Sequence, residues 1–358
     1  MKRRITVLLT LAMLLSIFAG CAGTPVVYYS DCTCPAGSHD ITPDTKPEPT
    51  RPAAEGAVKT GLAIITSLDG TVGAAGGENG LAKYDVTLVA VTVTDEGVID
   101  SCIIDGLGAS VNFNAEGLPV DFEPGAAVQT KNELGDNYGM VAWGGAVAEW
   151  YQQAAALAEY AKGKTVEELK NGAIDETGHA KDADLATTAT IYLGGYVAGI
   201  EKAVQNAQHL GAQAGDTLKL ATINKLDASA AQEAGGGAQL AVDATALTVR
   251  DGVITSCVID SLQASVEFDG TGAVTTDLTA PVQTKNELGA GYGMVAWGGA
   301  IAEWNEQAAS FAAYVTGKTA QQVAGIAVTE GRPADADLAA SVTIAIGGFQ
   351  ALIAKALS

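Results

Sequence analysis

The segments Val128-Gln-Thr-Lys-Asn-Glu-Leu-Gly135 and Tyr138-Gly-Met-Val-Ala-Trp-Gly-Gly-Ala146 occur twice in this chain of 358 residues. They return without a substitution as Val282 to Gly289 and Tyr292 to Ala300, at an offset of 154 residues. A repeat of this length indicates a duplicated domain, because the repeats of solenoids are several times shorter. We therefore expect each functional feature to occur once in each copy.

Each copy begins with the alternating pattern of β-strands and then changes to helical spacing. Residues 85–93 and 98–104 alternate around an Asp-Glu-Gly turn, which predicts a β-hairpin, and residues 243–249 and 253–259 repeat the pattern. A long helix is expected next in each copy, with one apolar face. Its apolar positions are Trp143, Val147, Trp150, Ala154, Leu157 and Ala161, and then Trp297, Ile301, Trp304, Ala308, Phe311 and Val315. Strands followed by helices predict an α+β fold: two tandem copies of one domain, each an antiparallel sheet followed by packed helices.

The N-terminal residues resemble a secretion signal. Three basic residues precede an almost uninterrupted apolar stretch up to Ala19, and Phe18-Ala19-Gly20-Cys21 resembles the lipobox of bacterial lipoproteins. The alternatives are an ordinary secretory signal or an uncleaved anchor helix. The predicted organisation is a lipoprotein signal peptide at 1–20, a Pro-rich spacer at 21–58, and the repeated domain at 59–210 and 211–358. Lipidation of Cys21 implies an extracytoplasmic protein anchored to the cell membrane by lipid.

Composition excludes several classes of function. The chain has 41 Asp and Glu against 20 Lys and Arg, and its formal charge of −21 argues against nucleic acid as a partner. It has only 3 histidines and no Ser-His-Asp, His-Glu-x-x-His or EF-hand pattern, so neither a hydrolase nor a metal site is expected. Cys102 and Cys257 occupy equivalent strand positions, where buried free thiols are expected.

A segment near the end of each copy carries a family resemblance. The first copy has Asp184-Leu-Ala-Thr-Thr-Ala-Thr190, and the second has Asp337-Leu-Ala-Ala-Ser-Val-Thr343. The spacing resembles the motif Asp-x-x-Ser/Thr-Gly-Ala-Thr/Ser of the FMN-binding domain of bacterial surface flavoproteins. That resemblance implies covalent FMN, esterified through its phosphate to Thr190 and Thr343, with Asp184 and Asp337 as the motif acids. Thr188 and Ser341 stand where the motif has glycine.

The repeated loop is the second candidate site. Thr130 and Glu133 have the spacing of a capping box, as do Thr284 and Glu287, which predicts a single helical turn before a glycine. The functional alternative places the side chains of this loop in a ligand cleft, with lysine binding a phosphate or carboxylate. The cofactor-binding candidates in the loops are Lys131 and Glu133, and Lys285 and Glu287. Trp143 and Trp150 could stack on a flavin, but their spacing points first to the core.

Two functions follow from these observations. The first is a membrane-anchored lipoprotein with duplicated FMN-binding-like domains, which passes electrons to a redox partner or binds a flavin-like small ligand. The second is a cofactor-free ligand-binding or interaction lipoprotein of the cell envelope. Both predict a carrier or binding protein rather than an enzyme with its own turnover, since the flavin would supply the redox chemistry.

Overall fold

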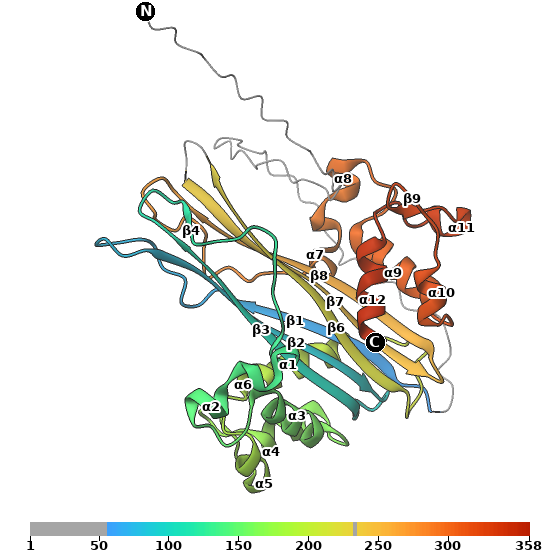
Figure 1. Ribbon diagram of the computed structural model, residues 1–358. Coiled ribbons are helices and arrows are strands. Elements are labelled where there is room, and N and C mark those ends of the chain that lie inside the picture. The colour runs from blue at the N-terminus through green and yellow to red at the C-terminus, as the bar shows by residue number, and fades with distance from the viewer. Residues whose placement is uncertain (1–55, 232–234) are drawn as a thin grey trace, which may run out of the picture. The chain divides into compact units, whose positions relative to one another are not determined.

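The structure is a computed structural model that describes residues 56–231 and 235–358 (Figure 1). The predicted signal peptide, Cys21 and the spacer up to residue 55 lie outside the described residues. Val58, which the sequence assigned to the spacer, is 1% exposed, and its N–H donates to the Ala212 carbonyl at 3.1 Å. The folded part therefore begins before residue 59.

The first copy forms an antiparallel sheet of the order β1-β2-β3-β4. The predicted hairpin is confirmed, and its strands are longer than the alternating pattern indicated. The Asp-Glu-Gly turn connects the two strands of the hairpin. Its Gly97 has a φ of 82°, a conformation that favours glycine. The strands are β1 (Lys59–Ser67), β2 (Gly80–Val93), β3 (Ile99–Phe113) and β4 (Pro119–Val120).

The second sheet has the order β5-β6-β7-β8 and is also antiparallel. Its edge strand comes from the first copy, because Ala126 and Ala127 pair with Leu226 and Lys225. Asn224 extends this contact by donating its side-chain amide to the Val128 carbonyl at 3.0 Å. The strands are β5 (Ala126–Ala127), β6 (Thr217–Ala231), β7 (Gly235–Arg250) and β8 (Val253–Phe268).

The two copies share a hydrophobic core and together form one compact unit. Buried side chains of both sheets meet in a single cluster, in which the rings of Phe113 and Phe268 stack with centroids 3.9 Å apart. The Tyr84 hydroxyl donates to the Ala238 carbonyl across the same interface at 2.7 Å. Each sheet thus buries one face against the sheet of the other copy.

The opposite face of each sheet is covered by the helices of its own copy (Figure 1). The layers follow one another as helices, sheet, sheet and helices, and the α+β prediction is confirmed. The first copy has α1 (Lys131–Leu134), η1 (Gly135–Tyr138), α2 (Met140–Gly144), α3 (Trp150–Ala161), α4 (Val166–Ala173), α5 (Ala183–Thr188) and α6 (Gly194–Gln205). The second has α7 (Lys285–Leu288), η2 (Gly289–Tyr292), α8 (Met294–Gly298), α9 (Trp304–Val315), α10 (Ala320–Ala324), α11 (Ala336–Ala339) and α12 (Gly347–Ala356), with β9 (Val328–Thr329) and β10 (Arg332–Pro333) forming a small ribbon.

The single long helix expected from Trp143 to Ala161 was wrong. Gly145 ends α2 with a φ of 63°, and α3 starts only at Trp150, after a capping box formed by Glu149. Trp143 is therefore outside the core, with 88% of its surface exposed, whereas Trp150 is buried at 3%. The apolar spacing predicted one helix where there are two, because the glycines between them carry no side chain that would interrupt an apolar pattern.

A further expectation concerns the cysteines. Cys102 and Cys257 are buried free thiols, as predicted, and burial raises the pKa of each thiol to about 12. Such thiols are poor nucleophiles, because the thiolate is the reactive form. Within residues 56–231 and 235–358, no helix has the length and apolarity needed to cross a membrane.

Candidate functional site

Thr190 is an exposed residue two positions after the end of α5. Its position is set by Gln153 of α3, whose side-chain oxygen accepts the N–H of Thr190 at 2.8 Å, the N–H of Ile191 at 3.1 Å and the Thr190 hydroxyl at 3.3 Å. Gln153 is fully buried, and its amide N–H donates to the Ala148 carbonyl at 2.8 Å. The amide is thus held at both ends and fixes the backbone that carries Thr190.

The second copy repeats this arrangement with Gln307 of α9. Its side-chain oxygen accepts the N–H of Thr343 at 2.8 Å, the Thr343 hydroxyl at 3.2 Å and the N–H of Ile344 at 3.2 Å. Thr343 is half-buried, in contrast to the exposed Thr190. The sequence contains no motif that predicts the role of these glutamines; the signal available is their identical position in the two copies, three residues after Trp150 and Trp304.

The motif acids do not hold the threonines. Asp184 and Asp337 are exposed, and their carboxylates make no hydrogen bond or ion pair with any described residue. The acids two residues earlier have a structural role instead: the carboxylate of Asp182 accepts the N–H of Leu185 at 3.0 Å, and that of Asp335 accepts the N–H of Leu338 at 3.0 Å. These bonds cap α5 and α11.

The position of the motif glycine has ordinary helical geometry in the first copy. Thr188 is the last residue of α5, and its hydroxyl donates to the Leu185 carbonyl at 3.1 Å. The Ser341 hydroxyl likewise donates to the Leu338 carbonyl at 3.3 Å. Neither residue has a positive φ, so neither backbone position requires glycine.

The capping boxes of the repeated loop are confirmed. The Glu133 carboxylate accepts the Thr130 N–H at 3.0 Å, and the Thr130 hydroxyl accepts the Glu133 N–H at 3.2 Å, with the same pair of bonds between Thr284 and Glu287. Lys131 extends from this turn, with its ammonium 5.0 Å from the centre of the Trp150 ring and 5.4 Å from that of Tyr138.

Lys285 stands in the same way in the second copy, 4.9 Å from the Trp304 ring and 5.1 Å from the Tyr292 ring. Trp150 and Trp304 are buried at 3% and 6% exposure, so they support the lysines from below and offer no open face to a ligand. The core interpretation given to Trp143 and Trp150 is confirmed for Trp150 and wrong for Trp143, which is 88% exposed.

Helix α3 connects the two candidate segments of the first copy. Trp150 lies under Lys131, and Gln153, three residues later, holds Thr190. Residues three apart on a helix are neighbours on its surface. The structure therefore brings Lys131 and Thr190 to the same turn of one helix, and α9 does the same for Lys285 and Thr343 through Trp304 and Gln307.

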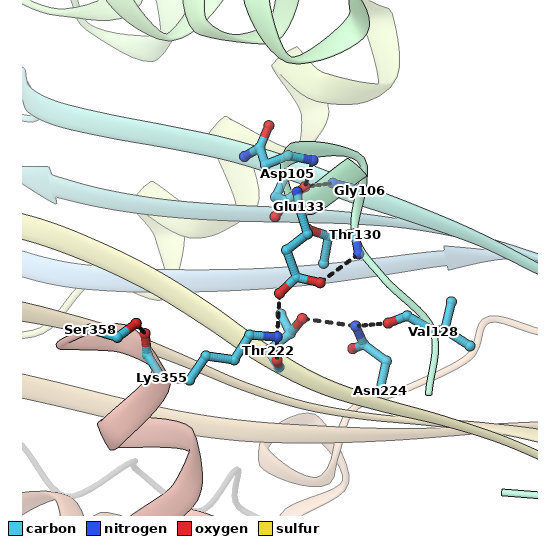
Figure 2. Close-up of polar contacts among 10 residues, drawn as sticks. Asp105, Gly106, Val128, Thr130, Glu133, Thr222, Asn224, Lys355 and Ser358 are labelled. Atoms are coloured by element: carbon cyan, nitrogen blue, oxygen red, sulfur yellow. Dashed lines mark hydrogen bonds and ion pairs between the residues drawn. The ribbon is translucent and has the colours of Figure 1, made fainter. Parts of the chain in front are cut away.

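Glu133 and Glu287 face the other copy, which the sequence did not predict. Figure 2 shows that the Glu133 carboxylate forms an ion pair with Lys355 of α12, whose ammonium also donates to the Thr222 carbonyl of β6 at 2.7 Å. In the reverse direction, Lys202 of α6 lies 2.5 Å from Glu287 and donates to the Ile64 carbonyl at 2.9 Å. The two glutamates thus connect the copies.

A buried carboxylate lies beside each ion pair, and sequence reasoning treated both as ordinary strand residues. Asp105 accepts the N–H of Gly106 at 2.7 Å and that of Asn132 at 3.1 Å (Figure 2). Burial raises the pKa of Asp105, and it raises the pKa of Asp260, its counterpart, to about 6. Glu133 and Glu287 act in the same direction, because a nearby negative charge disfavours ionisation.

Other candidate sites lie away from these residues. A cavity of about 570 Å³ opens on the second sheet between Asp227, Gln239 and Glu267, and it contains none of the predicted site residues. In the part of the chain that the structure describes, no three His, Cys, Asp or Glu side chains converge as a metal site would require. Compared with models of known protein families, with curated proteins and with solved structures, the chain shows no significant match.

Proposed function

We propose that the chain is an extracytoplasmic lipoprotein, tethered to the cell membrane at Cys21, whose FMN-binding-like copies carry flavin for electron transfer to a redox partner. The observation that supports this proposal is the exposed residue Thr190, whose backbone is held by the buried Gln153. In this role the protein is a carrier without turnover of its own. The bound flavin supplies the electron chemistry.

The residues around Thr190 fit a phosphoester at that hydroxyl. Transfer from an activated flavin nucleotide forms the bond between the Thr190 oxygen and phosphorus, breaks the phosphoanhydride bond of the donor and releases the hydroxyl proton. The Thr190 hydroxyl then no longer donates to Gln153. The two backbone N–H donors of Thr190 and Ile191 keep their acceptor, at 2.8 and 3.1 Å. The segment thus retains its anchor after modification. Thr343 is half-buried, so we assign the attachment first to Thr190.

Mass spectrometry tests this assignment. The full chain is expressed with a flavin transferase of the surface-flavoprotein family. The peptides of the purified protein are searched for an FMN-sized mass increment, and the visible absorbance of the protein is recorded. Thr190→Val should remove the increment from its peptide. Thr279→Val is the control, because Thr279 is an exposed threonine outside both motif segments, and its hydroxyl donates to the Asp277 carboxylate at 2.7 Å.

The attachment proposal is refuted by a colourless protein without the increment, provided that the same transferase modifies a known substrate. An increment that persists in a Thr190→Val, Thr343→Val double variant would also refute it.

A cofactor-free binding lipoprotein is the second candidate, and the helical backbone at Thr188 favours it. The motif glycine has no conformational role there, and Thr188 is occupied by its bond to the Leu185 carbonyl. In this case Lys131 and Lys285 bind an anionic ligand. Calorimetry with inorganic phosphate and with free FMN should detect binding that Lys131→Met and Lys285→Met abolish. An unchanged signal in the double variant would exclude these lysines.

A further inference from the structure

Each copy exposes a tryptophan in an uncharged loop. We call residues 138–148 and 292–302 the tryptophan loops. Trp143 is 88% exposed and Trp297 is 90% exposed, which leaves most of each indole in contact with solvent. Exposed branched residues flank both indoles: Val141 and Val147 in the first loop, and Val295 and Ile301 in the second. An exposed apolar patch with this composition marks a binding surface more often than an isolated apolar residue does.

The loops are built to hold the indoles in place. Gly139 has a φ of 81°, and a β-carbon there would lie 2.2 Å from Cδ1 of Trp143, so the glycine allows the indole to lie against the backbone. The buried carboxylate of Glu149 accepts the N–H groups of Met140 and Val141, both at 2.9 Å, and thereby fixes the turn that carries the tryptophan. Gly293 and Glu303 do the same for Trp297.

The tryptophan loops are more alike than the core beneath them, since they differ only where Val147 corresponds to Ile301. In the core beneath them the copies differ: the buried Leu157 corresponds to Phe311, and the buried Ala161 corresponds to Val315. The nine residues from Tyr138 to Ala146 nevertheless return unchanged as Tyr292 to Ala300. Some buried positions, such as Trp150 and Trp304, are identical as well, but core packing does not require the identity of Trp143 and Trp297, which are 88% and 90% exposed.

The charge distribution restricts the class of ligand. Neither tryptophan loop contains a charged residue, in a chain with a formal charge of −21. The field of such a chain repels anionic polymers and anionic lipid surfaces, while an uncharged ligand is unaffected. The area of one indole and two small branched side chains is also far smaller than the roughly 800 Å² that each partner buries in a stable protein interface. A neutral ligand with small flat units fits these limits.

We propose that Trp143 and Trp297 are two equivalent stacking platforms for the sugar rings of a neutral polysaccharide. The C–H face of a pyranose is apolar and flat and matches an indole face, while its hydroxyls stay in water. The loops belong to the helix layers on opposite faces of the paired sheets, so a single flat surface does not reach both. A repeating polymer offers many identical units, and two weak platforms then gain affinity by avidity.

Native-gel affinity electrophoresis tests the proposal with the full chain. The gels contain a soluble neutral glucan, mannan or galactan. The mobility of the chain should fall in at least one of them. Trp143→Ala and Trp297→Ala should each weaken the apparent affinity about tenfold, because avidity is lost, and the double variant should migrate as in a gel without polysaccharide. Val328→Ala is the control, because Val328 is an exposed apolar residue (46%) outside the tryptophan loops.

Several results would overturn the proposal. The first is an unchanged mobility in all three polysaccharides, and the second is equal retardation of the double variant and the unmodified chain. Co-sedimentation with phosphatidylcholine vesicles that requires both tryptophans would assign the loops to lipid. A concentration-dependent mass in analytical ultracentrifugation that the double variant lacks would assign them to self-association. The flavin assay at Thr190 is independent of each of these outcomes.

Discussion

Glu133 of the first copy forms an ion pair with Lys355 of the second, and Glu287 pairs with Lys202 in the reverse direction at 2.5 Å. Each lysine also donates to a strand carbonyl of its own copy, so each connects its own sheet to the neighbouring copy. The glutamates serve two purposes, since the same carboxylates close the capping boxes with Thr130 and Thr284. A cap that depends on local sequence is thereby coupled to the contact between the copies.

The first prediction concerns these ion pairs. Lys202→Met should lower the free energy of unfolding by about 1 kcal/mol, because a half-exposed pair and a bond to a carbonyl are lost together. Lys162→Met, which removes a pair with Glu159 within one helix, is the control and should cost less than about 0.5 kcal/mol. Urea denaturation measures both values. Equal effects of the two substitutions would show that the contact between the copies contributes nothing.

The second prediction concerns Asp260, whose pKa burial raises from 3.8 to about 6. A carboxyl with a raised folded-state pKa binds its proton more tightly in the native state, so its contribution to stability falls as pH rises from about 4 to 6. Asp260→Asn keeps an oxygen acceptor but cannot ionise. The variant should therefore gain about 2–3 kcal/mol relative to the unmodified chain between pH 4 and pH 7.

Urea titrations at several pH values measure this difference. Asp269→Asn provides the comparison, because hydrogen bonds from Thr271 lower the pKa of Asp269. The ionised Asp269 therefore contributes stability that is lost as pH falls, the opposite dependence to that of Asp260. A stability difference between Asp260→Asn and the unmodified chain that does not change with pH would contradict the prediction.

The third prediction concerns Gln153. Gln153→Ala removes the acceptor of two backbone N–H groups and the Thr190 hydroxyl, and should cost about 2–3 kcal/mol. Hydrogen exchange at Thr190 and Ile191 should accelerate more than exchange elsewhere in the copy. Gln205→Ala, at an exposed position of α6, should change stability by less than about 0.5 kcal/mol. Slow exchange at Thr190 in the variant would show that another group holds this segment.

The fourth prediction concerns Gly139. Gly139→Ala places a methyl group at a positive φ and against Trp143, and should cost about 1–2 kcal/mol. The indole must move, so the Trp143 contribution to fluorescence should change as well. Gly144→Ala is the control, since no atom of the described residues lies within 4 Å of the added carbon. A Gly139→Ala protein with unchanged stability and emission would show that the loop does not hold the indole.

Contacts between residues that are close in the sequence could be predicted, and contacts between residues far apart in the sequence could not. The hairpins and capping boxes were predicted because their residues are neighbours: Thr130 and Glu133 contain all the information that one helical turn needs. Lys355 and Glu133 are separated by more than half of the chain, and no local pattern indicates their pairing. The edge strand β5 could not be predicted for the same reason, because its two alanines pair with a strand that lies about 100 residues later in the sequence.

The candidate site shows the same limit. The threonines were found through a spacing of six residues from an acid, but the acids that cap the helices are Asp182 and Asp335, and the threonines are held by glutamines. A buried glutamine in a helix has no signature of its own in the sequence. The tryptophan loops were predicted as part of a long helix for a related reason. Apolar spacing does not show that a helix ends at a Gly-Gly pair.

The strand β5 has a consequence for the order in which the chain folds. Residues 126–127 leave the ribosome about 90 residues before the strand β6 with which they pair, and half of the shared core is contributed by strands that follow. The first copy therefore exposes an unpaired segment and an apolar sheet face until synthesis of the second is well advanced. Such long sequence separations between contacts slow folding. The first copy is therefore expected to reach its final packing only when the strands of the second copy are present.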